Sequence, residues 1–182
     1  MSKPTQPTDS SKFWIESLKT IGLSLFLALG VRTAVAEPRY VPTGSMEPTI
    51  HINDRVLIDK ISYRFSPPKR GDIAMFSPPD VLLEQNLRDD LIKRVIGLPG
   101  ETVEVRDGRV YINDEPLQEN YIAAPPEYQW GPEVVPPDSY LVLGDNRNNS
   151  YDSHFWGYVP RERMIGRAMV RFWPPHRIGA VD

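Results

Sequence analysis

Cysteine is absent from this sequence of 182 residues, and histidine occurs only three times. Without cysteine there is no thiol nucleophile, no thiolate zinc or iron–sulfur site and no disulfide framework. His51, His154 and His176 are too widely spaced to indicate a histidine-rich metal site. A formal net charge of only −3 excludes a strongly basic nucleic-acid-binding protein. Any hydrolytic chemistry must therefore use hydroxyls, carboxylates, lysines or one of the histidines.

No uncharged run in the N-terminal region reaches the ~20 residues that a membrane-spanning helix needs. Residues 20–31 carry no charge, and the wider segment 13–36 includes Lys19 and Arg32. As a helix, these 24 residues extend about 36 Å, which crosses a bilayer if both cations reach toward the head groups. We therefore predict a retained transmembrane signal-anchor helix over residues 13–36, preceded by a disordered tail over residues 1–12.

Three alternatives for this segment stay open. Residues 34–36 read Ala-Val-Ala, the A-x-A pattern of a cleaved secretory signal, although Arg32 lies in the turn before it. A helix lying on the membrane surface needs a continuous polar face, which the sequence provides for one turn only. A buried core helix is the third, but soluble helices are seldom apolar on all sides.

Proline is abundant, in contrast: 19 residues, roughly twice its usual share. This argues against a helix bundle and for short strands joined by rigid turns. Asp107 and Gly108, between two alternating segments, indicate a two-residue hairpin. Residues 118–138 hold five prolines, and we expect an extended surface loop there. Strands are predicted within residues 54–61, 72–76, 90–97, 102–106, 109–113, 139–144 and 164–173.

Residues 37–182 are therefore expected to form one domain that is large enough for its own hydrophobic core. The predicted fold class is mostly β: an antiparallel, partly open, β-barrel-like domain with one N-terminal transmembrane helix. The sequence has no internal repeat and no glycine-rich phosphate-binding loop.

The first candidate site residue is Ser45, in a segment rich in turn residues. Pro42, Gly44 and Pro48 bend the backbone around it, and Gly44 leaves room for another backbone to approach. A serine held in this way can present its hydroxyl and its backbone N–H to the same carbonyl group. The same residue types also make an ordinary solvated turn, so both interpretations stay open.

The second candidate is Lys93, in the segment 90–97. Strand alternation places Lys93 on one face and Arg94 on the other, each among aliphatic residues, which predicts a strand buried on both sides. A lysine that deprotonates a serine must be neutral, yet only about 0.1% of an ordinary lysine is neutral near pH 7.4. Lowering the lysine pKa to roughly 7.5–8 needs ~3–4 kcal/mol of differential desolvation. Charges that protect a sheet edge are the alternative.

Residues 144–157 are dense in side chains that carry oxygen. A calcium loop is one interpretation, but the segment lacks the closing glutamate of an EF-hand. In a second interpretation the segment supports Ser45 and Lys93: Asp145 and Asp152 pair with Arg94, while Ser150 binds the lysine amine. A polar turn whose side chains satisfy local backbone groups is the third.

Three segments, in this order and behind the predicted anchor, resemble the sequence boxes of bacterial type I signal peptidases of the compact form. The resemblance runs over residues 13–175 and implies a membrane-anchored, β-rich serine endopeptidase that removes signal peptides from exported preproteins. It implies no cofactor and no metal. The segments are Ser45-Met46-x-Pro48-Thr49, Lys93-Arg94-x-x-Gly97-x-Pro99-Gly100 and Gly144-Asp145-Asn146-Arg147-x-x-Ser150-x-Asp152-Ser153.

The resemblance also implies a role for each matching residue. Ser45 is expected to be the nucleophile and Lys93 its general base. Thr43 and the Ser45 N–H would form the oxyanion hole. The residues expected to support this dyad are Ser150, Arg94, Asp145 and Asp152.

The partners and the location follow from the same resemblance. Substrates are expected to be preprotein signal peptides with small residues at the first and third positions before the cut, because shallow pockets exclude larger side chains. Residues 37–182 should face the trans side of a bacterial-type plasma membrane or a thylakoid-type membrane. The lipid bilayer and the secretion translocon are the other expected partners, and nucleic acid is not. Residues 34–36 then become a candidate self-cleavage site, with the intact anchor as the working form.

Three residues depart from the family pattern. Thr43 replaces the serine of some members, Glu101 replaces a usual aspartate, and His154 stands where an arginine is common. The last change puts a salt bridge there in doubt. Two other functions stay open: a Ser-His-Asp hydrolase that uses His154 or His51, and a non-enzymatic β-module that binds extended peptides by strand addition.

Overall fold

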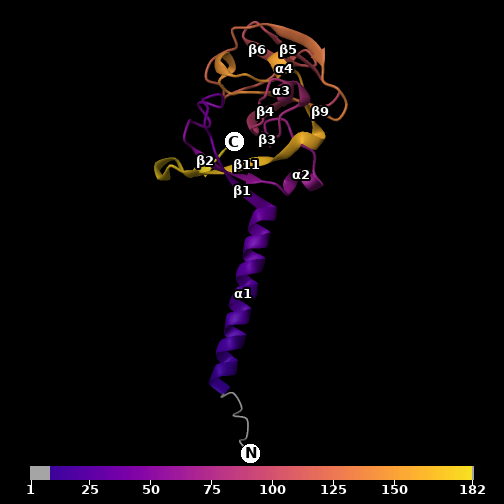
Figure 1. Cartoon of the computed structure of the whole chain (residues 1–182). Helices are drawn as coiled ribbons and strands as arrows, with labels where there is room; N and C mark the ends of the chain where they lie inside the picture. The colour runs from indigo at the N-terminus through magenta and orange to yellow at the C-terminus, as the bar shows by residue number, and fades with distance from the viewer. Residues whose placement is uncertain (1–8, 182) are drawn as a thin grey trace, which may run out of the picture. The chain divides into compact units, whose positions relative to one another are not determined.

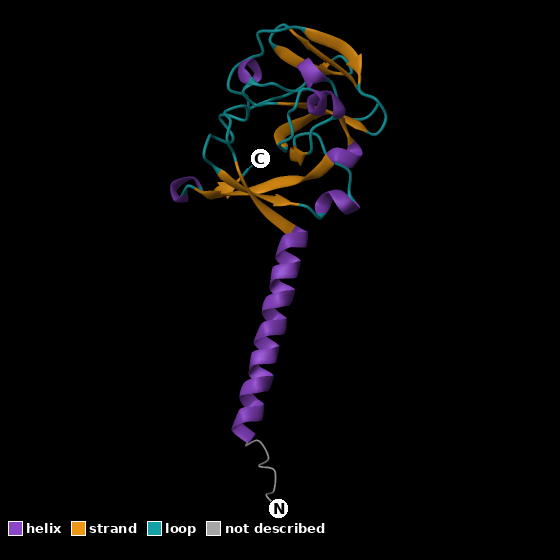
Figure 2. Ribbon diagram, in the orientation of Figure 1, coloured by secondary structure: helices purple, strands orange, loops and turns teal. Residues whose placement is uncertain are grey.

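The computed structural model describes residues 9–181. The chain divides into two compact units, Met1–Val35 and Ala36–Asp182. The described part of the first unit is one helix, α1 (Asp9–Val35), and the described strands all belong to the second unit (Figures 1 and 2).

Helix α1 begins earlier than the sequence predicted. Residues 9–12, expected to belong to a disordered tail, are helical, since aspartate and serine are favourable at a helix N-terminus. Residues 1–8 of that tail lie outside the described residues. Among the residues that the structure describes, no helix is both long enough and apolar enough to cross a membrane. The anchor over residues 13–36 stays a prediction.

The larger sheet of the second unit is an antiparallel sheet of eight strands that does not close on itself. Across the sheet, the order is β1 (Ala36–Tyr40), β2 (Arg55–Asp59), β11 (Met164–Trp173), β3 (Ile73–Phe76), β4 (Leu91–Gly97), β9 (Ser139–Leu143) and β10 (Val159–Pro160), with β12 (Gly179–Ala180) beside β11. The register of β11 shifts at three places along its pairing with β2 and β3, and such bulges curl a sheet. The mostly antiparallel β class is confirmed.

The smaller sheet has four antiparallel strands, among them β5 and β6 of Figure 1. Its order is β7 (Glu115–Pro116), β6 (Arg109–Ile112), β5 (Thr102–Arg106) and β8 (Trp130–Val134). Asp107 and Gly108 connect β5 to β6 with positive φ angles of 50° and 72°, which a type I′ turn requires. The predicted hairpin is confirmed.

The predicted surface loop over residues 118–138 is wrong in two places. Strand β8 forms there at the edge of the smaller sheet, where Pro132 is tolerated because an edge strand has one unpaired side. Val135 is fully buried, and the Glu119 side chain is only 4% exposed. High proline content therefore concealed both a strand and a buried carboxylate.

Three hydrophobic clusters fill the second unit, and β4 contributes to each. Val95 belongs to the first, Ile92 packs against the second, and Ile96 belongs to the third. Because β4 lies inside the sheet with apolar residues on both faces, it is buried from Lys93 to Gly97. This position places Lys93 and Arg94 in a dry interior, as strand alternation predicted.

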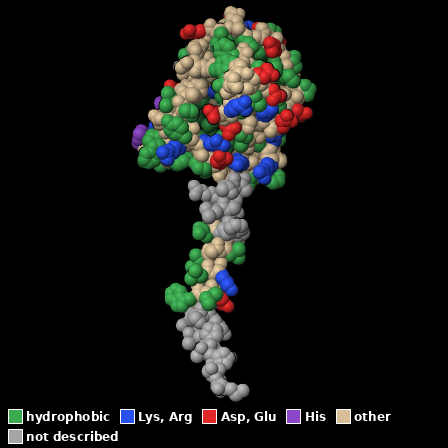
Figure 3. Space-filling model, viewed as in Figure 1, with side chains coloured by type: hydrophobic (Ala, Val, Ile, Leu, Met, Phe, Trp, Pro, Cys, Tyr) green, Lys and Arg blue, Asp and Glu red, His purple; other side chains and the backbone are tan. Residues whose placement is uncertain are grey.

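Turns and short helices connect the strands. The face of the second unit that Figure 3 shows has acidic and basic side chains side by side rather than in patches of one sign. This mixture agrees with the small net charge. The short α-helices are α2 (Ser62–Phe65), α3 (Asp80–Glu84) and α4 (Ser153–Trp156).

Candidate active site

Ser45 lies in the turn between β1 and β2, which is anchored in the protein interior. The Ile50 N–H donates to Met46 O at 2.9 Å and closes the turn. Met46 and Ile50 are 1% and 0% exposed, and both belong to the second hydrophobic cluster. Ser45 itself is only 9% exposed. It is therefore held in a fixed position, which rules out the solvated-turn interpretation.

Lys93 reaches Ser45 from β4, whose neighbours in the sheet are β3 and β9. Its Nζ donates to Ser45 Oγ at 2.8 Å and to Ile92 O at 3.1 Å. Lys93 is 3% exposed. The strand is internal, so protection of a sheet edge does not account for its cations. Two residues separated by 48 positions in the sequence thus form one buried pair.

Burial lowers the pKa of Lys93 to about 8, because a charged amine is poorly solvated in this interior. The negative charges of Asp152 and Asp145 act in the opposite direction and keep the pKa from falling further. With a pKa of about 8, roughly 20% of Lys93 is neutral near pH 7.4. An ordinary lysine is neutral about 200 times less often at that pH.

The loop that follows β9 contacts the backbone around Ser45. Asn146 donates its backbone N–H to Ser45 O at 3.1 Å and its side-chain amide to Gly44 O at 3.2 Å. Gly144 lies so close that a Cβ atom there would be 2.4 Å from Ser45 O, so only glycine fits. Thr43 Oγ1 lies 3.4 Å from Ser45 Oγ. The structure thus brings the Thr43 hydroxyl of the predicted oxyanion hole next to the Ser45 hydroxyl of the predicted dyad.

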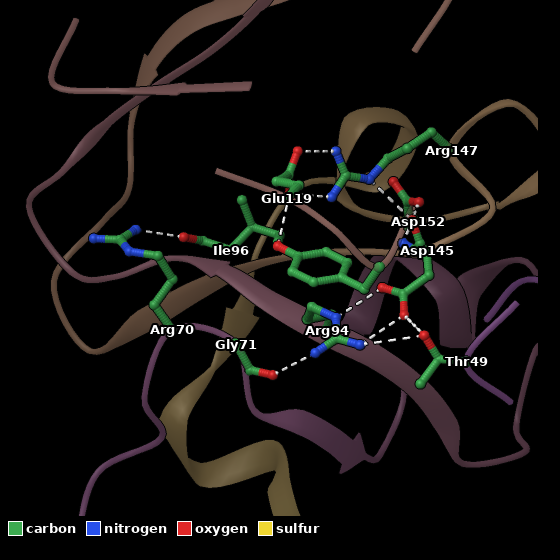
Figure 4. A network of polar contacts seen from close by, with 11 residues as sticks. Thr49, Arg70, Gly71, Arg94, Ile96, Glu119, Asp145, Arg147 and Asp152 are labelled. Carbon is green, nitrogen blue, oxygen red and sulfur yellow. Dashed lines mark hydrogen bonds and ion pairs between the residues drawn. The ribbon is translucent and has the colours of Figure 1, made fainter. Parts of the chain in front are cut away.

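Arg94 lies beside Lys93 in β4 and is paired with Asp145 (Figure 4). Its Nε and Nη2 donate to the two carboxylate oxygens of Asp145 at 2.8 and 2.7 Å. Nη1 donates to Gly71 O at 2.9 Å, and Thr49 donates its hydroxyl to Asp145 at 2.5 Å. The guanidinium carbon lies 3.9 Å from the centroid of the Tyr121 ring. The predicted pair between Arg94 and Asp145 is therefore present.

Asp152 accepts the Gly144 N–H at 2.9 Å and lies 2.6 Å from Nδ1 of His154. The histidine that departs from the family pattern thus still contacts this carboxylate, and its ring stacks on Tyr128 with centroids 4.1 Å apart. Ser150 Oγ is buried and has no hydrogen-bond partner among the described residues. The predicted bond from Ser150 to the lysine amine is therefore absent among the described residues, where the amine donates to Ser45 Oγ and Ile92 O.

A cleft of about 290 Å³ opens beside the pair, and both Ser45 and Lys93 line it. Its walls come from the residues that precede Ser45, the start of β4 and the segment 86–90. Much of the lining is apolar, and a peptide in this cleft would lie directly against the serine hydroxyl. The apolar lining residues are Tyr40, Val41, Pro42, Met46, Leu87, Leu91 and Ile92.

Several residues that hold the site together have no role predicted from the sequence. Arg147 occurs in the quoted box without a role, and it donates its Nε to Gly144 O at 3.0 Å. Glu119 and Tyr121 lie in the segment expected to be a surface loop. Asn146 also lies in the third sequence box, residues 144–153, and this position was the signal that it belongs to the site. Glu119 had no such signal, because its partner Arg147 lies 28 residues away.

The sequence matches a known protein family. The family described as "Signal peptidase, peptidase S26" matches residues 14–173. The chain belongs to this family. The peptidase is 64% identical over 177 residues to a signal peptidase I of Leptolyngbya laminosa, covering 96% of this chain and 87% of that relative. It is 60% identical over 166 residues to a probable signal peptidase I-2 of Synechocystis sp., covering 91% and 76%.

A chloroplast protein is also similar. The thylakoidal processing peptidase 1 of Arabidopsis thaliana is 40% identical over 168 residues, which cover 90% of this chain and 49% of that relative.

Family membership makes the protein a serine endopeptidase and excludes the non-enzymatic β-module. The Ser-His-Asp alternative finds no contact to support it. Within the described residues, no hydrogen bond joins Ser45 to either candidate histidine: His51 Nε2 lies 3.0 Å from Pro48 O, and the His154 ring contacts Asp152.

Proposed function

We propose that this peptidase cleaves signal peptides from preproteins with a dyad in which Ser45 is the nucleophile and Lys93 the general base. The contact of 2.8 Å between Lys93 Nζ and Ser45 Oγ carries the proposal. It is within the range in which a base can accept a proton directly. The lowered pKa of Lys93 supports the same role, since the neutral amine is the reactive form.

The proposed reaction has two stages. Neutral Lys93 accepts the hydroxyl proton while Ser45 Oγ attacks the scissile carbonyl, and the carbonyl carbon becomes tetrahedral. When the C–N bond breaks, protonated Lys93 gives this proton to the leaving amine, and an acyl-enzyme remains on Ser45. Neutral Lys93 then accepts a proton from a water molecule that attacks the ester, and this proton returns to Ser45 when the ester bond breaks.

The tetrahedral stage places a negative charge on the former carbonyl oxygen. The Ser45 N–H and the Thr43 hydroxyl are the proposed donors to this oxyanion. The distance of 3.4 Å between Thr43 Oγ1 and Ser45 Oγ puts the threonine hydroxyl next to the reacting atom. Such donors stabilise the transition state because they are in place before the charge develops.

The support residues act on the dyad through the backbone and through charge. We propose that Asp145 and Arg94 fix β4 against the loop after β9. Asp152 fixes Gly144 by accepting its N–H. Ser150 remains a proposed partner for the Lys93 amine, and its buried, unpartnered hydroxyl is consistent with such a bond during the reaction.

The cleft supports a substrate that is extended and carries small residues near the cut. Its lining is formed largely by bulky apolar side chains, which leave a volume of only about 290 Å³. Small residues at the first and third positions before the cut would fit, and larger ones would clash. An A-x-A site is therefore the proposed preference.

The names of the relatives support a location at a membrane. Signal peptidases of bacteria and a thylakoidal processing peptidase are among them. We propose that residues 13–36 anchor the chain in a plasma or thylakoid-type membrane as a single span, with residues 37–182 on the trans side. The lipid bilayer and the secretion translocon are then the proposed partners, beside the preprotein.

Cleavage of a preprotein by two variants tests the dyad. Ser45→Ala and Lys93→Ala should both lose cleavage by several orders of magnitude, while their far-UV circular dichroism stays that of the wild type. Rapid cleavage by a well-folded Lys93→Ala variant would refute the lysine as base. Rapid cleavage by Ser45→Ala would refute the nucleophile.

A further inference from the structure

A short segment outside the sequence boxes makes three contacts, two with the loop after β9 and one with strand β4. Glu119 accepts hydrogen bonds from Nη1 and Nη2 of Arg147 at 2.8 and 2.5 Å. The Tyr121 ring lies on the Arg94 guanidinium, and the Ala123 N–H donates to Asp145 O at 3.0 Å. Figure 4 shows Glu119 and the Arg147 guanidinium facing each other, with Arg94 and Asp145 nearby.

The Glu119–Arg147 pair leads to the serine through the backbone. Arg147 also donates its Nε to Gly144 O at 3.0 Å. Gly144 is packed against Ser45 O so closely that no side chain fits between them. Glu119 therefore fixes Arg147, Arg147 fixes the Gly144 carbonyl, and Gly144 sets the position of the Ser45 backbone.

Tyr121 leads to the lysine by a second route. Its hydroxyl donates to Glu119 at 2.7 Å, and its ring face lies 3.9 Å from the Arg94 guanidinium carbon. Arg94 is the neighbour of Lys93 in β4, and it is paired with Asp145. One segment thus contacts both buried arginines on which the proposed dyad rests.

Burial of the first pair is nearly complete: the side chains of Arg147 and Glu119 are 0% and 4% exposed. A buried ion pair often adds little to stability, because desolvation of the two charges offsets their attraction. Apolar residues of similar volume could replace the pair without loss of stability. They could not hold the Gly144 carbonyl, which needs a donor. A role in positioning therefore accounts for the pair better than stability does.

We propose that Glu119 and Tyr121 are positioning residues for catalysis, which hold Ser45 through Arg147 and Gly144 and hold Lys93 through Arg94. The proposal rests on the proposed Ser45–Lys93 dyad. It predicts that disturbing Glu119 lowers the rate of the chemical step while leaving substrate binding intact, because neither residue lines the cleft. Small displacements of reacting groups are sufficient, since a shift of about 1 Å can cost ~100-fold in rate.

The central test is the double variant Glu119→Met with Arg147→Met, which replaces the ion pair by side chains of similar size. We expect it to fold with a Tm lowered by several degrees, because the Gly144 carbonyl and the Tyr121 hydroxyl each lose a partner. We also expect kcat to fall at least about tenfold and KM to change less than about twofold. A kcat equal to that of the wild type would overturn the proposal. A fall in kcat/KM that is caused entirely by a higher KM would also overturn it.

A control with the same residue types but a more exposed ion pair exists on the smaller sheet, where the side chains of Arg106 and Glu104 are 37% and 20% exposed. Arg106 pairs with Glu104 at 2.5 Å and lies 4.1 Å from the Tyr111 ring centroid, so the same three residue types meet there, away from the cleft. Glu104→Met with Arg106→Met should leave kcat unchanged. A similar fall of kcat in this control would mean that the activity responds to any lost ion pair, and the proposal would be wrong.

If the double variant does not fold, Glu119→Gln keeps the proposal testable, because it preserves the shape and removes the charge together with one hydrogen-bond acceptor. We expect the plateau of kcat at high pH, where Lys93 is neutral, to fall about tenfold. A shift of the pH midpoint with an unchanged plateau would show a purely electrostatic role and would contradict positioning. So would a loss of stability with unchanged kcat per folded molecule.

Tyr121 provides an independent measurement. Tyr121→Phe keeps the ring on Arg94 and removes the bond to Glu119, whereas Tyr121→Leu removes both. We expect kcat to decrease more in the leucine variant than in the phenylalanine variant, and equal activity of all three proteins would contradict the role of the ring. Failure of this proposal is distinguishable from failure of the dyad, because Ser45→Ala would remain inactive in the first case only.

Discussion

At the scale of single residues, burial changes what a lysine can do. A charged amine is the ordinary form of lysine at neutral pH, and Lys93 departs from it because its strand is dry on both faces. The nearby carboxylates of Asp145 and Asp152 limit the fall of its pKa. The result is a side chain that is neutral often enough to act as a base and basic enough to hold the serine proton until the leaving amine accepts it.

Thr43 is the residue whose hydroxyl can be tested most cleanly. Thr43→Val preserves the shape of the side chain but removes the donor that we assign to the oxyanion. Its kcat should fall about 100- to 1000-fold, the usual effect of a lost oxyanion donor, whereas Thr43→Ser should stay active. Steady-state cleavage of a peptide substrate measures both. Equal rates for the valine and serine variants would remove Thr43 from the site.

Gly144 should not tolerate any side chain. A Cβ atom there would lie 2.4 Å from Ser45 O and 2.2 Å from Ser150 Oγ, so Gly144→Ala must displace the Ser45 backbone. We expect a loss of ~1–3 kcal/mol in unfolding free energy and a lower kcat. Gly179→Ala is the control, because no atom lies within 4 Å of the added carbon. Equal unfolding free energies and equal kcat values for the two variants would show that Gly144 is not packed tightly against Ser45 O.

At the scale of elements, the ion pair between Arg94 and Asp145 joins strand β4, which carries Lys93, to the loop after β9. Asp145→Asn replaces the carboxylate that accepts two hydrogen bonds from the buried Arg94 by a neutral amide, which should cost about 3–5 kcal/mol of unfolding free energy. Asp80→Asn removes a partner of Arg163 that is 82% exposed, and its effect should stay within ~0.5 kcal/mol. Urea unfolding measures both. A small loss for Asp145→Asn would mean that the pair is not structural.

The regular strands and the two residues of the proposed dyad were predictable from the sequence. Alternation found β4 and β11, and the Asp107–Gly108 turn found the β5–β6 hairpin, because these signals are local. Residue order within the boxes placed Ser45 and Lys93 at one site through resemblance. The signals are strong because each rests on residue types with few structural options.

The residues that escaped prediction depend on tertiary contacts. Glu119 lies in a proline-rich segment and has no pattern around it, and its burial follows only from the distant Arg147. Ser150 was expected to bind the lysine amine, but side-chain conformation decides that bond and no spacing encodes it. Strand β8 was missed because Pro132 is read as a breaker unless the strand is known to lie at an edge.

At the scale of the whole molecule, the proposed anchor can be tested in membranes. The full chain should sediment with membranes and stay there after carbonate extraction. Leu25→Lys, which places a charge within the uncharged run, should release it. Protease added to the trans side should digest residues 37–182. Release of the unchanged chain by carbonate would contradict a single-span anchor.

The pH dependence of kcat/KM for preprotein cleavage tests the dyad most directly. Because the free enzyme must have neutral Lys93, kcat/KM should rise with pH, with a midpoint of about 8, and level off above it. His154→Ala should keep this midpoint approximately, and Lys93→Ala should abolish the activity. A midpoint near 6.5 that disappears in His154→Ala, with activity retained in Lys93→Ala, would contradict the account and assign the base to histidine.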